Sequence, residues 1–247
     1  MTVIPSLNVP LLNVDVTPLR REELLAHIRD AAREHRRMLV AGHNLHSVYL
    51  WYSLPEFRDF YDRAGAVVVD GMPLLALMRI GLRVPLRTEH RIGSTDWVEG
   101  LAELEGIHRV SLLGGTPAAS AAVLRHLRSL GGEVDWQAIP GDPWRAENIE
   151  EVAESIREHD PQVLLIGMGM PLQERIADQL ASRIDVPVIA TVGGALDQLG
   201  GTQSLAPRRL GAMGLEWAWR LATDPRRLAG RYLLEPMKLA ALLMWRA

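Results

Sequence analysis

The feature that most constrains the fold is a short apolar run followed by glycines and a helix start, a pattern that recurs along the chain. Its clearest copy is PQVLLIGMGMPLQE, at residues 161–174. Residues 163–166 are too few for a helix and suit a strand buried on both faces. Gly167 and Gly169 permit a sharp turn, and Pro171 suits the first position of a helix. The pattern predicts either a plain tight turn or a site for a phosphate or sugar nucleotide at a helix N-terminus.

Polar residues and glycines also follow the other apolar runs. Gln173 and Glu174 fall in the first turn of the predicted helix, where their side chains can reach a ligand at the glycines. In an open α/β sheet, ligands bind beyond the carboxyl ends of the strands. The residues expected at this edge are Asn44, Asp70, Gly114, Gly115, Gly167, Gly169, Gln173, Gly193, Gly194 and Asp197. Asp70 is a lone carboxylate directly after a strand, and it either caps the next helix or has a chemical role.

Strands and helices alternate in the prediction. The strands are expected at residues 11–16, 38–41, 66–69, 110–113, 133–139, 163–166 and 186–192. The first helix is expected from Thr17-Pro18 to about residue 34, and two shorter helical pieces, broken at Pro55, follow the second strand. Another helix is expected from Pro73 to Gly81, and then a polar loop at 87–96, in which Thr95 or Asp96 can cap the next helix. The remaining helices are expected after Gly115, at 147–159 and from Pro171. This order predicts an α/β fold, a doubly wound, mostly parallel sheet with helices on both faces.

Charge separates the end of the chain from the rest. The 247 residues fit one α/β domain, expected at 1–206, with a helical appendage at 207–247. Eight basic and three acidic residues give the segment 208–247 a charge of +5, and the net charge of −3 leaves −8 for the remainder. A basic appendage suggests a pyrophosphate or membrane surface as partner, and the balanced total argues against nucleic acid.

The sequence also bears on location. There is no cysteine, which excludes a disulfide framework, a thiolate metal site and a cysteine nucleophile. We see neither a signal peptide nor a membrane-spanning run, so we expect a cytoplasmic protein. Residues 235–247 predict an apolar helix that starts at Pro236. From Met237 to Ala247 it is about 16 Å long, too short for a hydrocarbon core of about 30 Å. Either that helix anchors the protein at a membrane surface, or it packs in a homo-oligomer while Trp217, Leu221 and Leu228 pack on the main domain.

Several blocks of the sequence, taken together, resemble one protein family. They are VVVDGMP around Asp70, residues 91–96, LLGGTP from 112, IGMGMPLQE from 166, VGGALDQLGG from 192 and APRRLGAMGLEWAWRLATDPRRLAGRYL from 206. In their order and spacing they resemble the WecG/TagA/CpsF family of bacterial glycosyltransferases, over residues 36–234. The block at 166–174 and the arginine-rich block are more specific than a bare glycine pair.

The resemblance implies an inverting transfer of a sugar, often N-acetylmannosamine, from a uridine diphosphate donor to a sugar on a polyprenyl diphosphate. Family members act in cell-surface polysaccharide synthesis at the inner face of the cytoplasmic membrane. Asp70 corresponds to the proposed general base, and Asn44 and Gln173 to residues near the donor sugar. Arg220, Arg227 and Arg231 are expected over the diphosphate, and Arg91 and Asp96 belong to the remaining family block at the site.

The residues themselves agree with such chemistry. Inversion needs one base to take the proton of the acceptor hydroxyl, and a single carboxylate suffices. No Asp-x-Asp tripeptide occurs, so we expect no metal or other cofactor, and arginines and helix N-termini are left to stabilise the departing diphosphate.

The chain departs from the family at a few positions. Gly42 stands where a threonine is usual, Gly93-Ser94 where Thr-Gly is common, and Gln198 where an aromatic residue is common. His43 or His46 can supply a replacing polar contact, or both are ordinary exposed histidines. Two other functions remain open, a non-catalytic paralogue and a nicotinamide-dependent oxidoreductase. Against the second, Leu172 stands where the dinucleotide fingerprint needs its third glycine.

Overall fold

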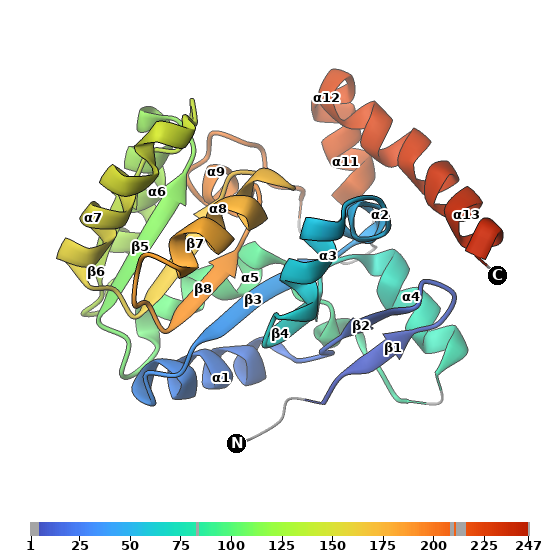
Figure 1. The fold of residues 1–247 in the computed structure, drawn as a ribbon, viewed down its shortest axis with the longest axis horizontal. Helices are drawn as coiled ribbons and strands as arrows, with labels where there is room; N and C mark the ends of the chain where they lie inside the picture. The colour runs from blue at the N-terminus through green and yellow to red at the C-terminus, as the bar shows by residue number, and fades with distance from the viewer. Residues whose placement is uncertain (1–4, 83, 208–209, 211–215, 247) are drawn as a thin grey trace.

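A single parallel sheet forms the centre of the molecule (Figure 1). The computed structural model describes residues 5–82, 84–207, 210 and 216–246. Six strands lie in the order β4–β3–β8–β7–β5–β6, and every neighbouring pair is parallel. They are β3 (Met38–His43), β4 (Ala66–Val69), β5 (Arg109–Gly114), β6 (Asp135–Ile139), β7 (Val163–Gly167) and β8 (Val188–Thr191). All six carboxyl ends therefore meet at one edge of the sheet.

Helices cover both faces of this sheet. One face packs against α1 (Arg21–Arg33), α5 (Ser94–Val98), α6 (Pro117–Ser129) and α9 (Ala195–Leu199). The other packs against α2 (Leu45–Ser53), α3 (Pro55–Asp62), α7 (Ile149–His159) and α8 (Leu172–Ala181). Successive strand residues alternate between the two cores, as Leu164 and Leu165 do, which is why the strands read as continuous apolar runs. The predicted fold class is confirmed.

The N-terminal strand prediction was wrong in part. The segment forms an antiparallel hairpin apart from the main sheet, with β1 (Leu7–Val9) paired to β2 (Val14–Val16). Leu11 and Asn13, predicted as strand, lie in the turn with φ of 68° and 47°. Leu11 is 78% exposed, so its apolar side chain does not mark a buried strand.

The first helix begins later than Thr17-Pro18 predicted. The backbone N–H of Thr17 donates to Val67 O, and its Oγ1 accepts from Val67 N, both at 2.7 Å. Thr17 thus ties the hairpin to β4 instead of capping a helix. Helix α1 starts at Arg21, where Glu23 Oε2 accepts the backbone N–H of Arg20 at 2.8 Å.

The segment at 87–96 is less loop-like than predicted. After α4 (Met72–Gly81), a 3-10 turn covers Thr88–His90, and α5 starts at Ser94 with Gly93 as its N-cap. Thr95 and Asp96 were expected to cap this helix, but both lie inside its first turn. Asp96 nevertheless satisfies the helix start, because its Oδ2 accepts the N–H of Gly93 at 2.7 Å.

The later boundaries agree with prediction to within a few residues. A second 3-10 turn, Glu99–Glu103, follows α5, and a third, Ala146–Asn148, precedes α7. Pro171, expected as the first helical residue, is the N-cap of α8. The helix therefore starts one residue later than predicted, and Gln173 and Glu174 still fall in its first turn.

A string of helices forms the end of the chain, drawn in red in Figure 1. It comprises α11 (Glu216–Thr223), α12 (Pro225–Ala229), a π-helical turn (Gly230–Leu234) and α13 (Glu235–Arg246). Helix α13 packs against α2, and the side chains of Leu228 and Leu239 are buried. We call residues 216–246 the appendage and the remainder the body. The predicted division at residue 206 stays a prediction.

Candidate active site

A cleft of about 580 Å³ lies at the carboxyl edge of the sheet. Its walls come from the loops after β3, β4, β5, β6, β7 and β8, and from the appendage. Of the predicted site residues, the cleft is lined by Asn44, Asp70, Arg91, Gly115, Gly167, Gly169, Gln173, Gly193, Gly194, Asp197, Arg220 and Arg231. Residues more than 180 positions apart in the sequence thus meet in one cavity.

Asp70 follows β4 directly and is held by three hydrogen bonds. Its N–H donates to the carbonyl of His43 at 3.0 Å, and its own carbonyl accepts Nε of Arg91 at 3.1 Å. Its carboxylate Oδ2 accepts Nδ2 of Asn44 at 3.0 Å. The carboxylate therefore has a fixed place in the cleft and an oxygen, Oδ1, beside Gly93.

Asn44 orients that carboxylate because both ends of its amide are engaged. As the N-cap of α2, its Oδ1 accepts the N–H groups of His46 and Ser47 at 3.0 and 3.1 Å. Only the NH₂ end is left for Asp70, so the helix start fixes which way the amide faces. The sequence predicted Asn44 near a donor sugar, and the geometry adds that it holds Asp70.

Arg91 lines the cleft, whereas the side chain of Asp96 does not. Nη1 of Arg91 lies 3.6 Å from Oδ2 of Asp96, the same oxygen that accepts from Gly93. The carbonyl of Asp96 also accepts Nε of Arg21 at 2.7 Å. Asp96 thus bonds to the loop that carries Arg91.

The glycines serve different purposes. Gly115, Gly167, Gly169, Gly193 and Gly194 line the cleft. Gly114 does not, and a Cβ at this position would lie 2.2 Å from the carbonyl oxygen of Gly167 on the neighbouring strand. Gly114 therefore permits β5 and β7 to approach at their ends. Gly193 has φ of 56° and open space around its Cα, so the backbone itself faces the cleft.

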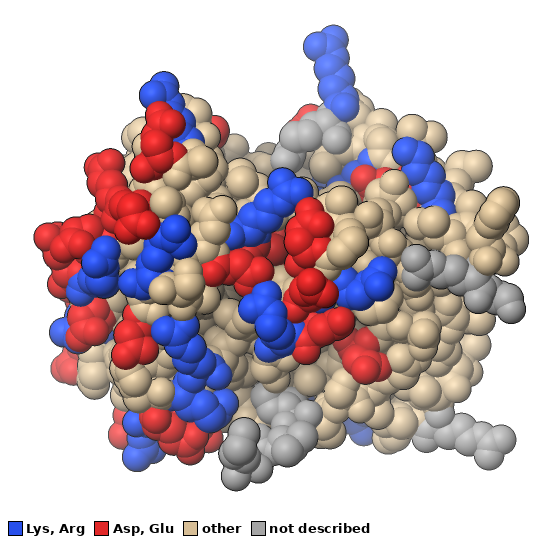
Figure 2. Space-filling model, viewed as in Figure 1, with Lys and Arg blue, Asp and Glu red and all other residues tan. Residues whose placement is uncertain are grey.

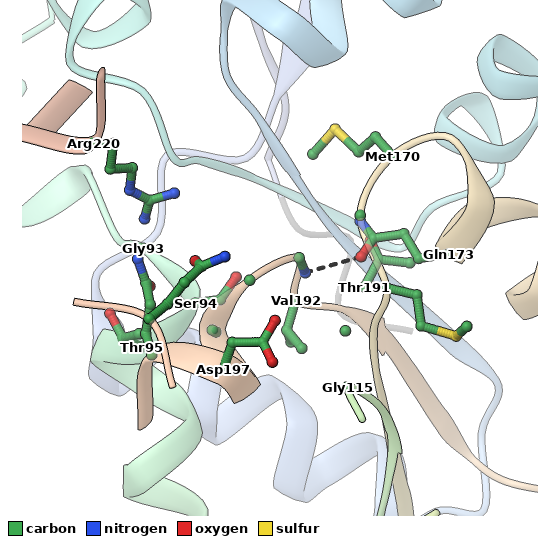
Figure 3. A pocket seen from close by; sticks show the side chains of 18 of the residues that line it. Gly93, Ser94, Thr95, Gly115, Met170, Gln173, Thr191, Val192, Asp197 and Arg220 are labelled. Atoms are coloured by element: carbon green, nitrogen blue, oxygen red, sulfur yellow. Dashed lines mark hydrogen bonds between the residues drawn. The ribbon is translucent and has the colours of Figure 1, made fainter. Parts of the chain in front are cut away.

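Gln173 and Glu174 form a buried pair. Nε2 of Gln173 donates to Glu174 Oε1 at 2.8 Å, and its Oε1 accepts the N–H of Gly193 at 2.9 Å (dashed line in Figure 3). Burial raises the pKa of Glu174 to about 7, although the hydrogen bond from Gln173 opposes the shift. Glu174 is not among the residues that line the cleft.

The appendage closes one side of the cleft. Figure 3 shows Arg220 extending from the appendage, above Gly93 and Asp197 in this view. Backbone N–H groups of Thr202 and Gln203 donate to the carbonyl of Asp197 at 2.9 and 3.0 Å, which fixes the turn after α9.

Arg231 brings a second positive charge into the cleft. Burial lowers its pKa, and Arg220 acts in the same direction, while the charges of Asp70 and Glu235 act against the shift. Nε of Arg231 makes no hydrogen bond within the described part of the chain. The side chain of Arg227, the third predicted arginine, lies outside the described residues.

Sequence reasoning missed part of the lining. Asp142 and Trp144 follow β6, and Thr223, Asp224 and Leu228 come from the appendage. The same rule that selected the other loops, a polar residue just beyond a carboxyl strand end, would have found Asp142.

Within residues 5–82, 84–207, 210 and 216–246, no three His, Asp or Glu side chains are grouped closely enough to hold a metal ion. Among the same residues, no helix has the length and apolar character required to span a membrane.

The fold and the cleft define an α/β protein in which the Asp70 carboxylate, held in place by hydrogen bonds, and two arginines line a cleft at the carboxyl edge of a parallel sheet. Such a site is suited to an anionic ligand. The model of the glycosyl transferase WecG/TagA/CpsF family matches residues 9–247. The chain belongs to this family and is a glycosyltransferase by that membership.

Proposed function

We propose that the protein is an inverting glycosyltransferase that moves a hexose, such as N-acetylmannosamine, from a uridine diphosphate donor to a sugar on a polyprenyl diphosphate. The reaction belongs to the synthesis of a cell-surface polysaccharide. The observation that carries this proposal is that one cleft joins the fixed carboxylate of Asp70 to Arg220 and Arg231 of the appendage.

Asp70 is the general base in this proposal. The acceptor hydroxyl attacks the anomeric carbon from the face opposite the diphosphate, and its proton passes to the Asp70 carboxylate. A carboxylate is a much weaker base than an alkoxide. Proton transfer is therefore late and concerted with formation of the glycosidic bond. The hydrogen bond from Asn44 keeps one carboxylate oxygen oriented while the other takes the proton.

The arginines carry the charge of the leaving group. When the bond between the anomeric carbon and the diphosphate breaks, negative charge accumulates on the diphosphate oxygens. Arg220 and Arg231 line the cleft, and guanidinium groups donate paired hydrogen bonds to such oxygens. In this proposal no divalent metal is required.

The acceptor places the reaction at a membrane. A polyprenyl chain stays in the bilayer, so the protein acts as a peripheral protein at the inner face of the cytoplasmic membrane. Support comes from exposed apolar side chains on the appendage, among them Met237 and Trp245.

Substitution of Asp70 by asparagine tests the proposal. The amide keeps an oxygen that accepts from Asn44, so the local fold and donor binding persist, whereas the base is lost. We expect kcat to fall by about 10²–10⁴-fold, the range of general base catalysis. The Kd for the uridine diphosphate donor should change less than about threefold, measured by calorimetry, because only the reacting step loses a group.

The matched control is Asp185→Asn, an exposed aspartate outside the cleft that pairs with Arg37. It should leave both kcat and Kd near the wild-type values. Full activity of Asp70→Asn, or complete loss of wild-type activity on chelation of divalent metals, would contradict the mechanism. Binding of donor and acceptor without any turnover by the wild type would favour a non-catalytic paralogue.

A further inference from the structure

Glu174 is a buried acid that the proposed chemistry does not use. Its side chain is 2% exposed, and Gln173 beside it is 1% exposed. Helix α8 points the two side chains away from solvent, and of the pair only Gln173 borders the cleft.

A chain of two hydrogen bonds leads from Glu174 to the cleft. Glu174 Oε1 accepts Nε2 of Gln173 at 2.8 Å, and Gln173 Oε1 accepts the N–H of Gly193 at 2.9 Å. Gly193 begins the glycine turn after β8 and lines the cleft. Figure 3 shows the second of these bonds, which joins the first turn of α8 to the turn after β8.

The acid determines which end of the amide faces Gly193. A Gln amide turned by half a rotation would present its NH₂ group to the N–H of Gly193, so that two donors would face one another. An acceptor on the other side favours the observed orientation, and Glu174, which can accept in both protonation states through Oε1, supplies it.

Keeping an acid at this place is costly. Glu174 Oε2 makes no hydrogen bond within the described residues, and burial of such a group without a partner is unfavourable. Asp178 of α8 adds a like charge. Tyr61 of α3 is also close, because the pKa of its phenol, raised first by burial, is raised further by the charge of Glu174. Burial raises the pKa of Glu174 to about 7. An apolar residue would avoid this cost, so the acid is expected to have a use.

We propose that Glu174 is a positioning residue, which orients the amide of Gln173 and through it the Gly193 turn against which the donor lies. This inference rests on the proposed function. It also replaces the expectation that the Glu174 side chain reaches the substrate itself. The carboxylate form accepts more strongly than the acid form, so Gly193 is held best above pH 7 and less well below it.

The first test measures Gly193 without any turnover. The amide resonance of Gly193, followed by ¹H–¹⁵N NMR in the whole protein, should shift with pH around a midpoint near 7 in the wild type. The shift should be absent in Glu174→Gln, which keeps an acceptor oxygen but does not titrate. A Gly193 resonance that does not move between pH 6 and 8 in the wild type, or that moves equally in Glu174→Gln, would overturn the inference.

The second test is a double-mutant cycle on transfer. If Glu174 acts through Gln173, then Glu174→Ala and Gln173→Ala each lower kcat/KM by roughly 10-fold or more, and the double variant loses no more than the worse single one. Glu174→Gln should recover most of the loss of Glu174→Ala. Multiplied losses in the double variant would overturn the inference.

Ile176→Ala, at a buried position of the same helix, shows what loss of stability alone does, and so distinguishes a positioning role of Glu174 from a purely structural one. This variant should lower Tm, because it leaves a cavity, but keep the wild-type pH dependence of the Gly193 amide resonance. If wild-type protein transfers no sugar from any nucleotide donor, the proposed function fails, and the Gly193 titration still decides the role of Glu174.

Discussion

Nδ1 of His46 lies 2.5 Å from Oε2 of Glu235, and this contact joins helix α2 of the body to the first residue of α13 in the appendage. The side chains are 15% and 19% exposed. Glu235 is one helical turn beyond Arg231, which lines the cleft. The contact therefore fixes the appendage near the point from which an arginine enters the site.

His46 is neutral in this contact. Burial, with a further contribution from the charge of Arg231, lowers the pKa of His46 to about 3. Burial also raises the pKa of Glu235. A neutral imidazole can still donate its Nδ1–H to the carboxylate, so the hydrogen bond does not require a charged histidine.

We predict that Glu235→Ala loosens the appendage. It leaves a mostly buried donor of His46 without its acceptor, which should lower the free energy of unfolding by about 1–3 kcal/mol. Denaturant unfolding measures this loss, and hydrogen exchange should show faster exchange in α13. The matched control is Glu99→Ala, which removes the acceptor of His126 at 2.7 Å in a more exposed pair. Equal losses of unfolding free energy in the two variants would show that the contact of His46 with Glu235 stabilises the fold no more than an exposed pair does.

The same pair predicts a pH dependence. The unfolded chain binds a proton at His46 near pH 6.5, whereas the folded protein binds it only near pH 3. The stability due to neutral His46 is thus fully present above pH 6.5 and is lost as the pH falls. His46→Asn keeps a donor but does not titrate, so its unfolding free energy should fall less steeply between pH 6.5 and 4. Parallel curves for the variant and the wild type would contradict this assignment.

The sheet could be predicted from the sequence because its strands are buried on both faces and so read as apolar runs between glycines. The errors arose where distant contacts decide local structure. Thr17 looks like a helix cap but pairs with Val67, 50 residues away. Leu11 lies in a turn. It was predicted as strand because its apolar side chain does not differ from that of a strand residue.

Much of the candidate site also followed from the sequence, because residues after parallel strands share one edge of the sheet. Asp70 and Asn44 are together for this reason. The direction of helical side chains is harder to read, so Asp96 and Glu174 were expected to reach the substrate although neither lines the cleft. The contact of His46 with Glu235 spans 189 positions and leaves no local signal in the sequence.

Gly42 supports a prediction about the position of Asp70. A Cβ on Gly42 would lie 3.3 Å from Cβ of Asp70 and 3.5 Å from Cγ2 of Val68. The first distance is tight, so a side chain here has to displace Asp70 by a few tenths of an ångström. Gly42→Ala should therefore lower kcat by roughly 3–10-fold, since small errors of position weaken catalysis, with little change in donor Kd.

Gly42→Thr adds the side chain usual in the family and a hydroxyl in the cleft beside Asp70. We expect it to change the ranking of nucleotide sugars in a turnover panel as well as kcat. The control is Gly65→Ala, whose Cβ would meet Cγ of Met38 at 3.1 Å, before the start of β4 and away from the cleft. If Gly65→Ala lowers kcat as much as Gly42→Ala does, crowding beside Asp70 is not the cause.

The two faces of helix α13 differ, which bears on the alternatives of anchoring or packing. Leu239 is buried, and Leu242 and Leu243 pack on the same core as α2. Met237, Met244 and Trp245 are 70%, 74% and 93% exposed. The right side of Figure 2, where α13 lies, is largely uncharged, whereas charges of both signs cover the body on the left. The face of α13 that carries Leu239 thus packs on the body, and the face that carries Met237, Met244 and Trp245 is exposed.

We predict that the exposed face binds anionic vesicles. Its 12 residues span only about 18 Å, so the helix lies along the surface. Replacing Met237, Met244 and Trp245 together by glutamine should weaken co-sedimentation with phosphatidylglycerol vesicles at least about 10-fold, since burial of each side chain contributes roughly 1.5–3 kcal/mol. The fold should persist, because none of the three is buried. Leu130→Gln, at the partly exposed end of α6, is the control and should bind as the wild type does. Undiminished binding of the triple variant would show that this face is not the membrane contact.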